Sequence, residues 1–256
     1  MKLRCTILGS GTSHGVPVIG CSCPTCRSSD PRDNRLRPSV LIETDENIIL
    51  IDTSSDFRQQ MLRARPERLD AVLYTHHHFD HIGGFDDLRQ FNHIQHGPVE
   101  CYGLKPTLEE IRVSFRYAFE KDIQKGGGVP LVSLHEITPG VIAPAGLTVQ
   151  AIPVLHGHLD ILAYRVGDFA YLTDVSGIPE ESYTALQGLE VLVLNALRHQ
   201  RHPTHFNIGD AVRAAKRIGA RSTFFTHMTH DVLHARDSEL LPENIALAYD
   251  GLVIEI

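Results

Sequence analysis

The amino-acid sequence predicts an α/β protein in which packed β-sheets carry helices on their outer faces. Three observations lead to this prediction. Apolar runs of strand length recur along the whole chain, amphipathic helical patterns are fewer and lie between them, and hairpin turns occur early. The chain has 256 residues, 42% hydrophobic and 21% charged, which excludes disorder, collagen and coiled coils. This length suits one large domain or two small ones.

The predicted strands are runs rich in Val, Ile, Leu and Phe, bounded by turn residues. Asp45-Glu46-Asn47 separates the second run from the third and predicts a hairpin turn. In chain order the runs are Leu3–Leu8, Val40–Thr44, Ile48–Asp52, Ala71–Thr75, Val99–Tyr102, Leu147–Ile152, Ile161–Val166, Phe169–Thr173, Val191–Leu194, Thr223–Thr226 and Leu252–Ile256.

The predicted helices have apolar residues spaced by three and four, or begin at a proline. In Ile208–Ile218 these residues share one face, with Asn207 as the expected N-cap and Gly219 as the expected end. The predicted helices are Thr107–Glu120, Pro179–Leu186, Ile208–Ile218 and a shorter one around Asn244–Ala248.

The charge and the apolar runs indicate a cytoplasmic protein that binds neither nucleic acid nor a membrane. The net charge is −7 with His neutral, so the field of the whole molecule does not attract nucleic acid. Apolar runs have strand length, well short of the ~20 residues of a membrane span. The N-terminus shows no signal-peptide pattern. An odd total of 5 Cys beside 16 His then favours metal binding over disulfides.

The strongest chemical signal is the run Thr75-His76-His77-His78-Phe79-Asp80-His81, between a predicted strand and the turn Ile82-Gly83-Gly84. Alternate residues of an extended segment share a side, so His76 and His78 can bind one ion. The turn can direct Asp80 and His81 toward a second ion. Imidazole and carboxylate ligands suit Zn²⁺, Mn²⁺ or Fe²⁺ in a catalytic site with open positions.

Three further ligand candidates follow later apolar strands, where functional residues commonly lie. They are His156, Asp174 and His227. His158 competes with His156, because the segment His156-Gly157-His158 offers two imidazoles, and His156 is preferred since it directly follows the strand.

A second cluster consists of Cys21, Cys23 and Cys26, three thiols within six residues. Three thiolates can bind one tetrahedral Zn²⁺ when a fourth ligand is supplied from elsewhere, and His230 is the candidate. Cys5 and Cys101 lie in strand patterns and are expected to be buried, inert thiols.

The run from His76 to His81, followed by distant His, Asp and His, resembles the signature of the metallo-β-lactamase superfamily over essentially the whole chain. The resemblance implies a four-layer αββα sandwich with metals at one edge. It also implies a single domain, residues 1–256, with a zinc-binding loop at residues 20–27. The implied ligands are His76, His78 and His156 for the first metal, Asp80, His81 and His227 for the second, and Asp174 as the bridge.

The segment Gly9-Ser10-Gly11-Thr12-Ser13-His14-Gly15-Val16-Pro17, the Cys cluster and the motif Thr226-His227-Met228-Thr229-His230 resemble the PhnP-type cyclic phosphodiesterases. This resemblance implies a phosphoric diester hydrolase that opens small cyclic ribose phosphates. Its cofactors would be two catalytic divalent ions (Zn²⁺ or Mn²⁺) and one structural Zn²⁺ on Cys21, Cys23, Cys26 and His230. A homodimer is also implied.

The candidate catalytic residues are Asp80 and His205. His205 precedes the helix at Ile208 and resembles the general-acid His of these phosphodiesterases, with His202 as the alternative. In the expected mechanism, a hydroxide held by both metals attacks phosphorus and His205 protonates the departing sugar oxygen. Asp52, at a strand end, either orients a ligand His or caps the strand.

Four alternatives remain open. A tRNA 3′-processing endonuclease would need a basic Gly/Pro-rich arm, for which Lys125-Gly126-Gly127-Gly128 is too short. Pyrroloquinoline quinone biosynthesis B proteins share the Cys loop but have a degraded histidine motif. A thioester or lactone hydrolase would keep the metals without needing His205. A zinc-stabilised binding module would need no catalysis.

Overall fold

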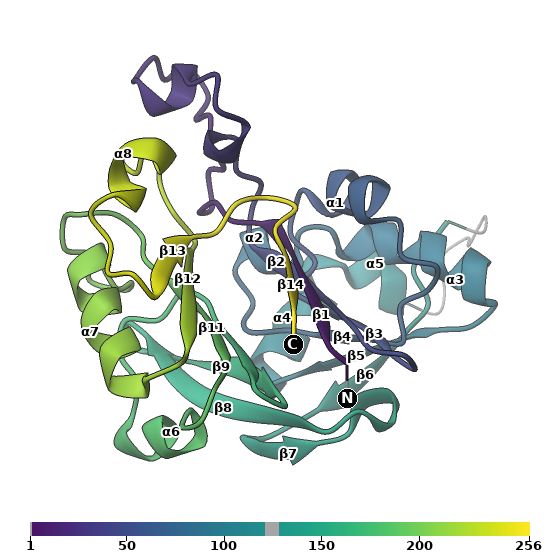
Figure 1. The fold of residues 1–256 in the computed structure, drawn as a ribbon. Coiled ribbons are helices and arrows are strands. Elements are labelled where there is room, and N and C mark those ends of the chain that lie inside the picture. The colour runs from purple at the N-terminus through teal and green to yellow at the C-terminus, as the bar shows by residue number, and fades with distance from the viewer. Residues whose placement is uncertain (1, 121–127) are drawn as a thin grey trace.

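The computed structural model describes residues 2–120 and 128–256, so most of the segment Lys125–Gly128 lies outside the described chain. Two seven-stranded mixed sheets face each other (Figure 1). The first has the order β14-β1-β2-β3-β4-β5-β6 and the second β13-β12-β11-β10-β9-β8-β7.

The strands of the first sheet are β1 (Arg4–Gly9), β2 (Ser39–Glu43), β3 (Ile48–Ile51), β4 (Ala71–Leu73), β5 (Val99–Gly103), β6 (Val132–Glu136) and β14 (Val253–Glu255). Those of the second are β7 (Gly140–Ile142), β8 (Val149–His156), β9 (Leu159–Val166), β10 (Phe169–Leu172), β11 (Val191–Asn195), β12 (Ser222–Thr226) and β13 (Ile245–Leu247). The helices are α1 (Phe57–Ala64), α2 (Phe79–Ile82), α3 (Arg89–Gln95), α4 (Lys105–Ser114), α5 (Arg116–Phe119), α6 (Glu180–Ala185), α7 (Ile208–Ile218) and α8 (His234–Ser238).

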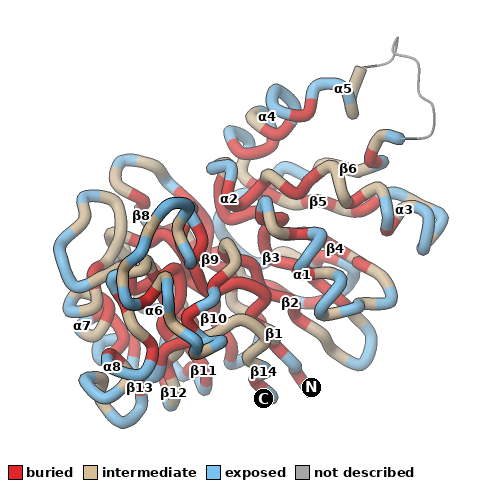
Figure 2. The backbone as a smooth tube through the Cα atoms, turned by 90° about the horizontal axis from the view of Figure 1, so that it is seen from above, coloured by how far each residue is buried: buried red, intermediate tan, exposed pale blue. Residues whose placement is uncertain are grey.

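Three apolar clusters hold the layers together. The central one fills the space between the sheets and includes the buried side chains of Tyr164 and Tyr171. A second joins α6 and α7 to the outer face of one sheet, and a third joins α1, α3 and α4 to the outer face of the other. Figure 2 shows the sheets largely buried and the helices with exposed outer sides. The predicted four-layer αββα sandwich is confirmed.

Helix α7 shows how local sequence sets an element. Asn207 caps it, its side-chain oxygen accepting a hydrogen bond from the Asp210 N–H at 2.8 Å, and Gly219 ends it with a left-handed φ of 73°. Between them Ala211, Ala215 and Ile218 are buried. These predictions are confirmed.

Two predicted helices differ from the structure. Residues 244–248 do not form a helix: Ile245–Leu247 is the edge strand β13, in which Thr223 of β12 pairs with Ile245. Burial alternates along β13, with Ile245 and Leu247 buried, as expected for a strand. The pairing with β12 outweighs the local helix preference of these residues. The predicted helix Thr107–Glu120 is two helices, α4 and α5, separated at Phe115, which leaves helical geometry (φ −114°, ψ 39°) and packs its ring against Phe85 at a centroid distance of 4.8 Å.

The edge of the sandwich where several strands end collects the candidate ligands. Strands β3 and β4 run parallel, as do β10, β11 and β12, so their carboxyl ends meet at one edge. A hydrogen bond from the Leu162 N–H to the Thr75 carbonyl, 3.0 Å, joins the sheets there. Helix α2 lies at this edge, and its Ile82 packs in the apolar cluster that joins α1, α3 and α4 to the first sheet. In the part of the chain that the structure describes, no helix has the length and apolar character needed to cross a membrane.

The carboxylate of Asp250 ties the C-terminal segment to this edge and makes stability depend on pH. It accepts hydrogen bonds from the Ser10 N–H and hydroxyl, both 2.9 Å, and from the Leu36 N–H at 2.8 Å. Burial nevertheless raises the pKa of Asp250 to about 6. A raised folded-state pKa gives a contribution that is full below the unfolded pKa and is lost as the pH rises through about 6.

We therefore expect wild type to lose stability relative to Asp250→Asn between pH 4 and pH 7.5. The expected change in the difference between their free energies of unfolding is about 2.4 kcal/mol, because each pKa unit of the shift corresponds to about 1.4 kcal/mol and the unfolded carboxyl is already partly ionised at pH 4. Urea unfolding of both proteins at the two pH values measures it. A difference that stays constant with pH would contradict this role for Asp250.

Candidate metal centres

The first group of candidate ligands consists of His76, His78 and His156. His76 and His78 come from the loop after β4, with Nε2 of the first 3.0 Å from Nδ1 of the second, and His156 ends β8. One ring nitrogen from each lies within 4.8 Å of the others. Burial lowers the pKa of His76 well below its usual value and lowers that of His78, so both rings are neutral, the form that binds metal.

The orientation of His156 is fixed by a backbone contact. Its Nδ1 lies 2.7 Å from the carbonyl oxygen of Thr204, so Nδ1–H donates and Nε2 keeps its lone pair. His158 is exposed and belongs to none of the ligand groups found among the described residues. The structure therefore brings His156, and not His158, to His76 and His78.

The second group consists of Asp80, His81, Asp174 and His227, all buried and with ligand atoms within 4.8 Å of one another. Nε2 of His81 lies 3.2 Å from Asp174 and 3.4 Å from Asp80, and Nε2 of His227 lies 3.1 Å from Asp174. Neither Nε2 atom forms a hydrogen bond with any part of the chain that the structure describes. Ring nitrogens this close to carboxylates but without hydrogen bonds are directed at a shared point.

The electrostatics of this group also favour a cation. Burial alone would raise the pKa of Asp174, but His227 and His81 hold it well below its usual range. Burial likewise opposes a charge on His81, yet Asp80, Asp174 and Asp52 raise its pKa well above the usual value. Three buried carboxylates around one imidazole leave negative charge in excess, so the donor set fits divalent ions with oxygen and nitrogen ligands.

Three residues at this edge, two of them candidate ligands, adopt a left-handed backbone. Asp52 (φ 63°) directly follows β3, Asp174 (φ 59°) lies just beyond β10, and His227 (φ 58°) directly follows β12. Such a conformation costs about 1–3 kcal/mol in a residue other than glycine and collects at functional sites. The strands thus end in turns that direct these side chains toward the common edge, and no sequence pattern signals this geometry.

Asp52 both joins two strand ends and orients a candidate ligand. Its carboxylate accepts hydrogen bonds from the Thr75 N–H and hydroxyl, each at 2.8 Å, and from Nδ1–H of His81 at 2.7 Å. This bond leaves Nε2 of His81 free to face Asp80 and Asp174. The two sequence-based alternatives for Asp52 are therefore not exclusive.

We expect Asp52→Asn to weaken divalent-metal binding at the His/Asp groups by about 10–100-fold, because the amide no longer fixes the His81 tautomer. Titration of metal-free protein with Mn²⁺ measures this. Asp168→Asn is the matched control, since Asp168 is exposed in the β9–β10 turn and pairs with Arg165. Equal affinity in wild type and Asp52→Asn would contradict the orienting role.

His205 reaches the site and His202 lies behind it. Nε2 of His205 is 3.0 Å from Asp174, and its ring lies between those of His156 and His227, with centroids at 4.6 and 5.0 Å. His202 contacts His205 through the two Nδ1 atoms, 3.1 Å apart. Burial lowers the pKa of His205 to about 4, against the raising effect of Asp174.

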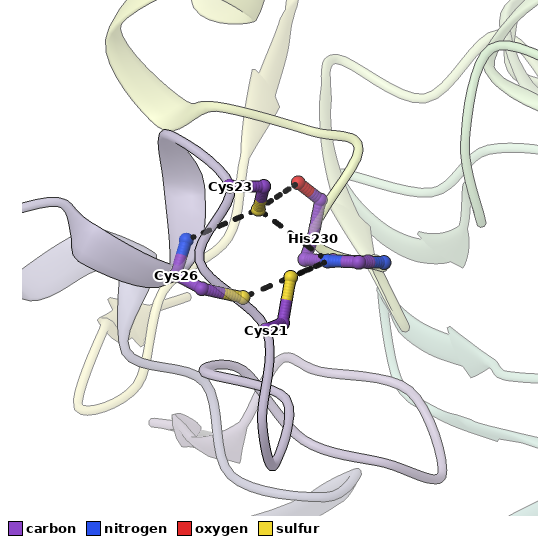
Figure 3. A group of neighbouring side chains, drawn as sticks. All are labelled: Cys21, Cys23, Cys26 and His230. Carbon is purple, nitrogen blue, oxygen red and sulfur yellow. Dashed lines mark hydrogen bonds between the residues drawn. The ribbon is translucent and has the colours of Figure 1, made fainter.

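The three cysteines gather around His230 (Figure 3). Nδ1 of His230 is 3.2, 3.4 and 3.6 Å from Sγ of Cys21, Cys23 and Cys26. A tetrahedral Zn²⁺ with bonds of about 2.3 Å to sulfur and 2.0 Å to nitrogen requires nitrogen–sulfur separations of about 3.5 Å. A hydrogen bond from the Cys26 N–H lowers the pKa of Cys23 to about 6, which favours its thiolate. The four side chains fit a zinc ion.

Comparison with known proteins shows which family and which solved structures this chain resembles. Residues 47–228 match the family described as Beta-lactamase superfamily domain. A crystal structure described as a new diphosphatase from the PhnP family is 43% identical, with a TM-score of 0.93, covering 100% of this chain and 98% of that one. Zn²⁺-bound PqqB from Methylobacterium extorquens shares the fold, with a TM-score of 0.77 at 19% identity over 99% of this chain and 100% of that one.

A protein of Porphyromonas gingivalis named octanoyltransferase is 43% identical over 254 residues, or 98% of this chain. The chain spans 51% of that protein, about half its length. The family match over 47–228 and the full-length likeness to the diphosphatase agree with each other and with the divalent-metal site that the fold implies. This chain belongs to the metallo-β-lactamase superfamily of hydrolases, in its PhnP-like branch.

Proposed function

We propose that the chain is a metal-dependent phosphoric diester hydrolase that opens small cyclic ribose phosphates. The observation that carries this proposal is the position of Asp174, which belongs to the Asp80/His81/His227 group and also lies within 4.8 Å of ligand nitrogens of His156 and His205. Such a shared carboxylate is typical of two-metal sites that hydrolyse phosphate esters. The likeness to a PhnP-family diphosphatase supports chemistry at phosphorus.

The residues divide between two ion positions. His76, His78 and His156 would hold one divalent ion, Asp80, His81 and His227 the other, and Asp174 would contact both. Bound ions in such a site lower the pKa of a water and offset charge on the phosphoryl oxygens. His81 and His156 contribute through fixed tautomers, set by Asp52 and by the Thr204 carbonyl.

His205 supplies the proton that the reaction needs. Water oxygen forms a bond to phosphorus, the bond from phosphorus to the sugar oxygen breaks, and Nε2–H of His205 protonates that oxygen. The product is a phosphate monoester, and the water proton restores the imidazole. Asp174 accepts a hydrogen bond from His205 and keeps its Nε2 facing the site. A bound phosphodiester brings a negative charge that favours the protonated ring.

A substrate comparison tests this proposal. The protein loaded with Mn²⁺ or Zn²⁺ is offered a five-membered cyclic ribose phosphate, an octanoyl thioester and a precursor tRNA. We expect ring opening of the cyclic phosphate to be fastest, with a net charge of −7 disfavouring the tRNA. Turnover of the thioester or the tRNA alone would contradict the proposal.

A second candidate is hydrolysis of an acyl thioester. A cavity of about 600 Å³ lies beside the β8–β9 hairpin, and its lining combines apolar residues such as Leu104, Ile137 and Leu159 with the charged or polar Lys105, Glu136, His158 and Asp160. The apolar part of this lining offers contacts for an acyl chain. The relative named octanoyltransferase gives this candidate further support. His205 would not be needed as a proton donor for a thiolate, so a thioesterase should tolerate its loss.

A further inference from the structure

The side chain of Arg35 lies at the base of the loop that carries the three cysteines. Two backbone hydrogen bonds between Val16 and Arg35, of 2.9 and 2.7 Å, close this loop, which projects above the sheets in dark purple in Figure 1. Arg35 itself is only 1% exposed. An arginine buried this completely must find partners for its charge and its donors.

The guanidinium of Arg35 bonds to two different parts of the chain. One terminal nitrogen donates to Asp33 Oδ1 at 2.9 Å, and the other donates to the carbonyl oxygen of Thr229 at 3.0 Å. Asp33 Oδ1 also accepts a hydrogen bond from the His234 N–H at 2.8 Å. Arg35 therefore connects the cysteine loop to the segment between His227 and His230.

That segment is short and firmly held. The Met228 N–H donates to the Ser10 carbonyl at 3.0 Å, and the Met228 carbonyl accepts from the Thr12 N–H at 3.2 Å. The Thr229 N–H donates to the Leu197 carbonyl at 2.9 Å. The Thr229 carbonyl accepts from Arg35 and also from the Val232 N–H at 3.2 Å, so every backbone polar group of these two residues is bonded and a shift at one end of the segment is transmitted to the other.

We propose that Arg35 is a positioning residue that couples metal binding at the cysteine cluster to the position of His227. This inference rests on the ligand assignments of the proposed function and concerns neither the substrate nor the reaction. When the cysteine cluster is filled, His230 is fixed, and through Thr229 and Arg35 so is His227. Without the guanidinium, the Thr229 carbonyl and the Asp33 carboxylate lose a partner and the two sites become independent.

A linkage experiment on metal-free protein tests the proposal without measuring activity. Mn²⁺, which suits oxygen and nitrogen ligands, is titrated calorimetrically with the cysteine cluster empty, and again after one equivalent of Cd²⁺, a soft ion suited to thiolates. The thiolate absorption band reports that the cluster is filled. In wild type we expect filling to tighten Mn²⁺ binding by about 5-fold or more. In Arg35→Met this factor should fall to about one.

Arg32→Met is the matched control, because Arg32 lies in the same loop but is exposed and pairs with Asp30. It should keep the wild-type coupling factor. If Arg35→Met does not fold, Arg35→Lys, which can keep one of the two bonds, should show a reduced factor. Two results would overturn this inference and leave the proposed function intact. In the first, wild type binds Mn²⁺ but filling the cysteine cluster does not change its affinity. In the second, Arg35→Met and Arg35→Lys keep the wild-type coupling factor. Absence of any Mn²⁺ binding would instead overturn the ligand assignments of the proposed function.

Discussion

Asp174→Asn is expected to lower metal-dependent hydrolysis of a phosphodiester by about 10³-fold or more. The carboxylate lies in the Asp80/His81/His227 group and also close to His156 of the first group, and its loss removes several kcal/mol of charge stabilisation, each 1.4 kcal/mol being tenfold in rate. Asn tolerates the left-handed backbone that Asp174 adopts, so the substitution changes charge more than conformation. Steady-state rates and metal content per chain measure the effect.

The control for this variant is the cysteine cluster, which Asp174 does not touch. Asp174→Asn should retain one zinc per chain there while losing divalent ions at the His/Asp groups. Activity above a tenth of wild type, with metal content unchanged, would show that Asp174 does not connect the two groups.

His205→Ala is expected to slow opening of a cyclic ribose phosphate by about 10²–10⁴-fold, the usual contribution of a proton donor. The loss should be much smaller with bis(p-nitrophenyl) phosphate, because p-nitrophenolate departs without a proton. The comparison of the two substrates separates a role in proton transfer from damage to the site.

His202→Ala is the matched variant, since His202 lies behind His205 and contacts it through Nδ1. It should cost far less than His205→Ala on the cyclic substrate. Equal losses on both substrates in His205→Ala would indicate that His205 holds a metal or shapes the site, which its position near His156 and Asp174 also permits.

Much of the candidate site was predictable because its signals are local. The run from His76 to His81 places several ligand types on one turn, and His156, Asp174 and His227 stand at or just after strand ends. Parallel strands bring such ends to one edge, so the predicted ligands meet in the fold. The cysteine cluster was predictable for the same reason, with three thiols in six residues.

The remaining features depend on tertiary contacts that leave no local pattern. The Thr204 carbonyl that orients His156 belongs to a loop 48 residues away, and any residue type could supply it. Residues 244–248 have a weak helical pattern but pair with β12, because an edge position in the sheet was available. Arg35 carries no periodicity or motif, and only its burial and its bond to Thr229 reveal a role.

The central claim is metal-dependent hydrolysis of a phosphodiester at the His/Asp groups. The most direct test compares bis(p-nitrophenyl) phosphate with the p-nitrophenyl monoester, using metal-free protein and protein reconstituted with Mn²⁺ or Zn²⁺. We predict that only the reconstituted protein cleaves the diester, that the monoester is spared, and that Asp174→Asn is inactive. Reconstituted protein that contains three ions per chain yet leaves the diester intact would contradict the account.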